Sequence, residues 1–193
     1  MATKTKAADH YPKQVKLRDG REVTVRIMDP ADNAKMLEFA RSLPEDDLLF
    51  LRTDITDATV IDGWIDNLKK GNTVTRLAEA ENKIAGYASV HREQARWTRR
   101  VGEIRMIASP RFRGAGLGRA LAAEIFQLAR GLGLKKISAM MTTDQTGART
   151  AFERLGFHVE AHLADWVEDR RGNPRDVLVM TYDVAGFTDQ AAA

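Results

Sequence analysis

The apolar positions between residues 117 and 132 recur at helical spacing. Leu117, Leu121, Ile125, Leu128 and Leu132 follow one another at intervals of four, four, three and four residues. This spacing places the five side chains on one face of a helix, and a stripe of this kind is buried when the helix packs on a sheet. We therefore predict a helix that covers a sheet, with these residues in the core.

Strand-like and helical patterns on both sides of this helix predict the remaining elements. Hairpins are expected where Asp19-Gly20 and Glu81-Asn82 interrupt alternating runs. The predicted strands cover 14–27 as a hairpin, 73–80, 83–93, 101–108, 135–142, 158–168 and 176–184. The other predicted helices cover about 29–43, 45–52, 57–69 and 144–155. This order, with one βαβ crossover after the strand at 101–108, predicts an α/β fold with a mixed sheet.

The chain length fits one domain. The chain has 193 residues, of which 44% are hydrophobic, and this is enough for a core of ordinary size. We expect a single domain over residues 15–184, a disordered tail over 1–14 and a flexible tail over 185–193. No apolar run approaches the roughly 18 residues of a membrane span, and the N-terminus lacks the apolar segment of a signal peptide. Cytoplasmic residence and no membrane partner are the resulting expectations.

A glycine-rich loop joins the strand at 101–108 to the long helix. Glycines at 114, 116 and 118 alternate with other residues, and Arg113 and Arg119 flank them. Glycines leave backbone N–H groups uncovered, and a helix start adds unpaired N–H donors. The loop is therefore suited to hold a diphosphate. It differs from a dinucleotide fingerprint, G-x-G-x-x-G, in its spacing, and the following strand at 135–141 carries no acidic residue.

The segment Arg113-Gly-Ala-Gly-Leu-Gly118 instead resembles motif A of the GNAT superfamily of N-acetyltransferases, R/Q-x-x-G-x-G/A. One strand later, Asp144 to Phe157 resembles the motif B of the same family, N-x-x-A-x-x-l-Y-e-k-l-G-F. Gly156 stands where a C-terminal αL cap belongs. The resemblance extends over roughly residues 23–184 and is closest to the GNAT domains of bacterial protein-lysine acetyltransferases, whose opening I-R-P-x-x-P-x-D is similar to residues 25–32.

The resemblance implies a mostly antiparallel central sheet with helices on both faces, and acetyl-CoA as the co-substrate. The loop amides would hold the pyrophosphate of acetyl-CoA, and the preceding strand would pair with its pantetheine arm. The residues that the resemblance assigns to the cofactor are Met106, Ile107, Ala108, Arg111, Arg113, Gly114, Ala115, Gly116, Leu117, Gly118, Arg119, Gln145, Ala148 and Phe152. A backbone N–H near 106–108 would polarise the thioester carbonyl.

Acetyl transfer to an ammonium group requires removal of a proton, because an alkylammonium has a pKa of about 10.4. Glu103 is the candidate base, since its place on the strand resembles the glutamate of the A-E-F segment in protein-lysine acetyltransferases. The alternative is that Glu103 pairs with a neighbour such as Arg105. His91 is a weaker candidate. The motif B tyrosine, which often protonates the leaving thiolate, is replaced by Phe152, and Gln145 occupies the asparagine position.

The distribution of charge suggests partners. Eight arginines lie between 92 and 119, whereas seven acidic residues lie between 45 and 66 with Arg52 as the one basic residue. A solvated face explains either run, but the basic region also suits a polyanionic cofactor and the acidic region a cationic acceptor. No nucleic-acid motif accompanies the basic run. The chain has no cysteine and four scattered histidines, so neither a Cys-acyl intermediate nor a metal site is expected.

Two functions remain open at this stage. The first is an acetyl-CoA-dependent N-acetyltransferase that acts on a protein lysine or a small cationic amine by direct attack in a ternary complex, as a monomer or homodimer. The second is a GNAT-fold module that binds acetyl-CoA as a sensor without turnover, which the replacement of tyrosine by Phe152 favours.

Overall fold

The computed structural model describes residues 11–48, 51–93, 95–169 and 171–184. These residues form one eight-stranded sheet with the order β1-β2-β3-β4-β5-β6-β8-β7. Its strands are β1 (Lys13–Lys16), β2 (Glu22–Ile27), β3 (Thr73–Ala80), β4 (Lys83–Arg92), β5 (Val101–Ala108), β6 (Lys136–Thr142), β7 (His158–Glu168) and β8 (Pro174–Asp183). Only β5 and β6 are parallel. The predicted mixed, mostly antiparallel sheet is confirmed.

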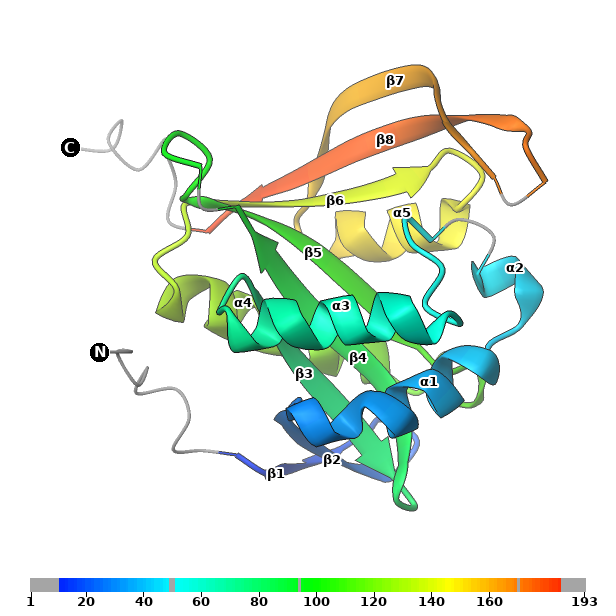
Figure 1. Ribbon diagram of the computed structural model, residues 1–193, viewed down its shortest axis with the longest axis vertical. Helices are drawn as coiled ribbons and strands as arrows, with labels where there is room; N and C mark the ends of the chain where they lie inside the picture. The colour runs from blue at the N-terminus through cyan, green and yellow to red at the C-terminus, as the bar shows by residue number, and fades with distance from the viewer. Residues whose placement is uncertain (1–10, 49–50, 94, 170, 185–193) are drawn as a thin grey trace.

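Helices cover both faces of this sheet (Figure 1). They are α1 (Asn33–Arg41), α2 (Glu45–Leu48), α3 (Ala58–Lys69), α4 (Leu117–Gly131) and α5 (Thr146–Arg154), with short 3-10 turns at Pro30–Asp32 and Pro110–Phe112. Helices α1 and α3 pack on one face around Leu77 and Tyr87. Helices α4 and α5 pack on the other face. Within the described residues, no helix has both the length and the apolar composition needed to cross a bilayer.

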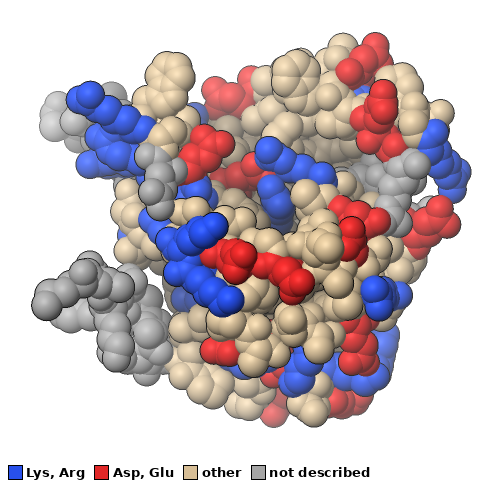
Figure 2. Space-filling view, viewed as in Figure 1, with Lys and Arg blue, Asp and Glu red and all other residues tan. Residues whose placement is uncertain are grey.

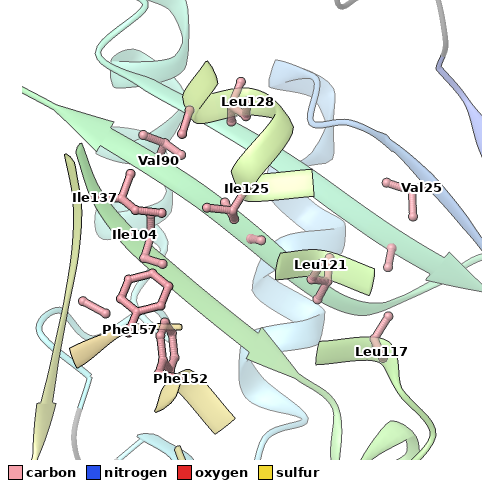
Figure 3. Packing of buried hydrophobic residues seen from close by; sticks show 14 of the residues in the cluster. Val25, Val90, Ile104, Leu117, Leu121, Ile125, Leu128, Ile137, Phe152 and Phe157 are labelled. Carbon is pink, nitrogen blue, oxygen red and sulfur yellow. The ribbon is translucent and has the colours of Figure 1, made fainter. Parts of the chain in front are cut away.

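The apolar stripe of α4 lies in the core, as its spacing predicts. Leu117 and Leu121 are 0% exposed and Ile125 is 1% exposed, and all three face the sheet (Figure 3). Leu132 follows the end of the helix and is partly buried. The stripe therefore anchors α4 to the sheet and fixes where its N-terminus lies.

The predicted boundary between the N-terminal tail and the first strand is wrong. Lys13 was expected in the disordered tail, but it pairs with Val25 in the sheet. Gln14, which was the last residue of the predicted tail and the first of the predicted hairpin, pairs with Thr24. Tyr11 of the predicted tail is also partly buried against the core. Residues 1–10 of that tail and the predicted tail at 185–193 lie outside the described residues.

The helix predicted over 45–52 is also shorter than expected, since α2 ends at Leu48. Residues 49–50 lie outside the described part of the chain, and 51–57 are not helical. The side chain of Asp54 accepts from the backbone N–H of Thr56 at 3.0 Å. A local bond of this kind competes with helix formation. Asp57 then caps α3 by accepting from the N–H of Thr59 at 2.8 Å.

Strands β5 and β6 separate soon after they begin. They pair only from Val101 to Glu103 on β5 and from Lys136 to Ser138 on β6. Strand β5 continues to Ala108 and β6 to Thr142 without further pairing to each other. An opening therefore lies in the middle of the sheet, at the end of β5 that leads into the glycine loop.

Candidate active site

The edge of β5 that faces this opening carries unpaired backbone groups. The N–H of Ser109 donates to Ala85 of β4 at 2.8 Å. Because backbone groups of a strand point alternately to its two neighbours, Met106 and Ala108 direct theirs to the opening. Ile107, which was predicted with them, directs its backbone to β4 opposite Tyr87. Met106 and Ala108 therefore offer the backbone donors and acceptors that an extended ligand would pair with.

The glycine loop at the end of β5 presents a second set of free donors. Within the described residues, no acceptor is found for the N–H groups of Gly114, Gly116, Leu117, Gly118 and Arg119. The first four N–H groups of a helix have no partner inside it, and they favour an anion. The structure thus brings together the loop residues that the sequence motif predicted as a diphosphate cradle.

Gly116 fits this cradle because of its backbone conformation. Its φ is +96°, in the left-handed region, and it is the residue before the first turn of α4. A Cβ at this position would lie 3.2 Å from Nε of Arg18. A side chain at 116 would therefore be strained and would fill the space in front of the free N–H groups.

The loop of the β1–β2 hairpin packs against the glycine loop and adds a cation that the sequence motifs did not reveal. The N–H of Arg18 donates to the carbonyl of Ala115 at 2.9 Å. Its guanidinium donates to the carbonyl of Gly114 at 3.4 Å. Nearby, Arg21 donates to the carbonyl of Arg111 at 2.7 Å and stacks 4.3 Å from the centre of the Phe112 ring. Nothing in the local sequence relates Arg18 to a loop 96 residues away; only the sheet order does.

The three arginines predicted for the cofactor differ in their surroundings. Arg113 forms an ion pair with Asp47 of α2, and Arg111 lies 3.7 Å from Glu81 in the β3–β4 turn. Arg119 is exposed and has no charged partner in the described part of the chain. Arg119 and Arg18 are thus the guanidinium groups next to the loop without a carboxylate partner among the described residues.

A small apolar hollow lies between β5, α4 and α5. Its lining includes Ile104, Met106, Ile125, Phe126 and Phe152. The ring of Phe152 is 9% exposed and stands edge-on to Phe157 at 5.0 Å between centroids. Phe152 thus contributes apolar surface and no proton donor.

The two other motif B residues hold the start of α5. Gln145 accepts through its side-chain oxygen from the N–H of Thr142 at 3.1 Å. Ala148 is partly buried against the core. Gly156 ends the following turn with φ of +92°, as the predicted αL cap requires.

Glu103 lies on the opposite side of β5 from the apolar hollow and is engaged by two arginines. Its Oε2 accepts from Nη1 of Arg52 at 2.6 Å. Its Oε1 accepts from Nε of Arg105 at 3.0 Å. The side chain of Glu103 is 25% exposed and that of Arg52 is 63% exposed. The predicted pairing with Arg105 is confirmed, and the structure adds Arg52. The role of Glu103 as a base stays a prediction.

His91 lies beside Glu103, because the two residues pair across β4 and β5. Its ring nitrogens lie 2.8 Å from Oγ of Ser89 and 3.1 Å from Oγ1 of Thr73. Burial, with a further contribution from the nearby positive charge of Arg105, lowers the pKa of His91 to about 4. His91 is therefore neutral near pH 7, and its two nitrogens are occupied by hydroxyl groups.

Several acidic residues between 45 and 66 have partners in the structure. Asp47 pairs with Arg113, Asp54 bonds to Thr56, and Asp57 caps α3. Asp66 lies 3.6 Å from Lys69, and the side chain of Asp46 lies outside the described residues. Figure 2 shows basic and acidic side chains next to one another around a hollow between the upper strands and α3. Asp47 and Asp66 thus have basic partners, whereas Asp54 and Asp57 bond to threonines.

Among the described residues, no three His, Asp or Glu side chains lie close enough together to bind one metal ion.

Comparison with known proteins places this architecture in a family. Residues 37–157 match the family model described as "Acetyltransferase (GNAT) family". No curated protein shows significant sequence similarity to the chain.

Several solved structures share the fold. An acetyltransferase of the GNAT family from Streptococcus pneumoniae has a TM-score of 0.73 and 22% identity, covering 83% of this chain and 99% of its own. The putative acetyltransferase yncA from Salmonella typhimurium, solved with acetyl-CoA, has a TM-score of 0.74 and 21% identity, covering 89% and 99%. The GNAT domain of PAT from S. lividans has a TM-score of 0.75 and 17% identity, covering 91% and 98%. Motif A forms the loop that leads into α4, and motif B forms α5. Because the family model matches residues 37–157, the chain belongs to the GNAT family of acetyltransferases.

Proposed function

We propose that this protein is an N-acetyltransferase that moves the acetyl group of acetyl-CoA to a primary amine in a ternary complex. The observation that carries the proposal is the continuity of the free backbone edge of β5 with the glycine loop. Met106 and Ala108 face the opening, and the unpaired N–H groups from Gly114 to Arg119 follow within a few residues. An extended arm that ends in a diphosphate fits such a surface.

The reaction requires three events. The neutral amine nitrogen forms a bond to the thioester carbon, the carbon–sulfur bond breaks, and the thiolate leaves with the bonding electron pair. The ammonium group loses one proton before the attack, and the nitrogen loses a second as the amide forms. The thiolate takes up one proton, so that one proton is released to solvent. Because the chain has no cysteine, an acetyl-cysteine intermediate is excluded, and direct attack by the amine is the simplest route.

The residues of this chain have distinct roles in the proposal. An N–H group of β5 at Met106 or Ala108 would donate to the thioester oxygen and stabilise the charge that develops there. Glu103, on the other face of the same strand, would accept the proton of the ammonium group. Since Phe152 has no acidic proton, water is the proposed donor to the thiolate.

The acceptor classes under consideration are a protein lysine and a small amine. A direct test incubates the protein with acetyl-CoA and a panel of lysine peptides, polyamines, aminoglycosides and amino acids. Free thiol and acetylated product are then measured together. Equal amounts of thiol and acetylated amine are expected for at least one acceptor.

The alternative function is an acetyl-CoA sensor without turnover, which the replacement of tyrosine by Phe152 favours. Tight binding of acetyl-CoA with no thiol release for any amine would support the sensor. Failure to bind acetyl-CoA would contradict both functions.

A further inference from the structure

The carboxylate of Glu103 has no free oxygen, although it is the candidate base. Arg52 donates to Oε2 at 2.6 Å. Arg105 reaches Oε1 through Nε and through a second guanidinium nitrogen, each at 3.0 Å. An incoming ammonium group therefore competes with an arginine for the oxygens of Glu103. Arg52 is the one that can move, because its side chain is 63% exposed whereas that of Arg105 is 30% exposed.

Glu103 and the two arginines that contact it carry a net positive charge. Two guanidinium groups face one carboxylate, and the neighbouring His91 is neutral near pH 7. The charged groups that act on His91 are these same three, Arg105, Glu103 and Arg52. Of the acidic residues nearest in sequence to Arg52, Asp54 bonds to Thr56, Asp47 pairs with Arg113, and Asp57 caps α3.

A simple cationic amine is a poor match for this arrangement. Its ammonium group would raise the local charge from one positive unit to two. It would also leave the guanidinium of Arg52 without the carboxylate that it contacts in the free protein. Charged groups that lose their partners in a complex reduce affinity and select against that ligand.

An amine with its own anionic group avoids both costs. Its ammonium group would take the place of Arg52 at Oε2 of Glu103, and its carboxylate would accept from the displaced guanidinium. The number of ion pairs then rises while the net charge stays constant. Planar guanidinium groups also match the two oxygens of a carboxylate.

We propose that the acceptor is a small zwitterionic amine of amino-acid type, with a carboxylate a few bonds from the nucleophilic nitrogen, and that Arg52 recognises this carboxylate. The inference rests on the proposed N-acetyltransferase function and names the substrate class for the same site. The sequence suggested that acidic residues attract a purely cationic acceptor. In this inference the acceptor instead binds by an exchange of ion-pair partners at Glu103.

The test compares matched acceptors that differ only in the anionic group. Leucine, phenylalanine and lysine are each measured against the corresponding amide and the corresponding amine without the carboxylate, with thiol release as the readout. The amides are the stricter comparison. Their α-amino groups resemble those at a peptide N-terminus, with a pKa of about 8, so they offer more neutral amine than the free amino acids at pH 7.

In the wild-type protein, kcat/KM for the amino acids is expected to exceed that for the amides and amines by about 10- to 100-fold, as for a charged hydrogen bond. Arg52→Ala should remove this preference, mainly through a higher KM for the amino acid, while the affinity for acetyl-CoA stays the same. Arg52→Lys should retain part of the preference for acceptors with a carboxylate. Lys69→Ala is the matched control, because Lys69 is also an exposed cation and pairs with Asp66 at 3.6 Å.

Three results would contradict the inference. The first is thiol release with amines but no preference for a carboxylate. The second is a preference that persists in Arg52→Ala. The third is a lysine peptide as the best acceptor. In each case the N-acetyltransferase function still stands. Absence of thiol release with every amine would remove that function, and this inference with it.

Discussion

The guanidinium of Arg18 lies against Gly116, although the two residues are 98 positions apart in the chain. A Cβ on Gly116 would be 3.2 Å from Nε of Arg18, and Arg18 also donates its backbone N–H to Ala115 at 2.9 Å. The hairpin loop between β1 and β2 thus holds a cation at the N-terminus of α4, where backbone N–H groups have no partner. This contact joins two features that favour a phosphate group.

We predict that Gly116→Val abolishes measurable binding of acetyl-CoA in calorimetry. The valine side chain would enter the space in front of the loop amides, and the φ of +96° is strained for a β-branched residue. Gly118→Ala is the matched control, because a Cβ there meets nothing within 4 Å and no positive φ is required. Circular dichroism should show that both variants fold. Unchanged binding in a folded Gly116→Val variant would place the cofactor elsewhere.

Removal of the Arg18 guanidinium should weaken acetyl-CoA binding by about tenfold, the order expected for one charged hydrogen bond. The measurement is the Kd of Arg18→Ala at two salt concentrations, and the difference from wild type should shrink at high salt. Arg130→Ala, an exposed arginine at the other end of α4, should bind as the wild type does. Equal affinities of wild type and Arg18→Ala at low salt would show that Arg18 serves only to hold the hairpin.

Glu103→Gln should lower kcat by about 100-fold, the order of general-base catalysis, and leave the Kd for acetyl-CoA within about twofold. The loss should shrink as the pH approaches 10, where the amine loses its proton without help. Glu153→Gln is the control, since Glu153 is an exposed glutamate that pairs with Arg149 at 2.8 Å. A loss that is independent of pH would assign Glu103 to positioning of Arg52 and Arg105 alone.

His91 should make the protein less stable in acid. Burial lowers its pKa in the folded state to about 4, whereas the unfolded chain has the ordinary value of about 6.5. Between these values the unfolded state binds more protons, so the free energy of unfolding falls as the pH drops from 6.5 to 4. The contribution of His91 to this fall is at most about 3 kcal/mol.

The measurement is urea unfolding of wild type and His91→Gln at pH 7 and pH 4.5. The variant should lose less stability between the two pH values than the wild type. His158→Gln, at an exposed histidine, should behave as the wild type. Equal pH dependence of wild type and His91→Gln would show that another group controls the acid sensitivity.

Local patterns in the sequence determined most of the elements and the conformation of the glycine loop. The spacing of Leu117, Leu121 and Ile125 specified one face of α4, and these residues are buried. The glycines at 114 and 116 specified a loop of positive φ before the helix. These features depend on residues close in the chain, so periodicity and backbone preference are sufficient to predict them.

The partners of the charged side chains could not be predicted in this way. The acidic run at 45–66 suggested a negative surface, yet Asp47 pairs with Arg113 and Arg52 reaches Glu103. Likewise, Arg18 joins the glycine loop only because β1 and β2 lie at the edge of the sheet on which α4 packs. Long charged side chains find partners that the sheet order brings near, whatever their distance in sequence.

The sequence by itself therefore determined that a glycine-rich loop of positive φ opens α4 and that a carboxylate stands ten residues before Arg113. Only the tertiary structure decided that β5 and β6 separate beyond Glu103 and Ser138, and that the carboxylate lies between two arginines. The physical reason is that backbone preference and side-chain spacing act over a few residues. Electrostatic pairing and strand separation instead depend on which surfaces the packed sheet and helices place side by side.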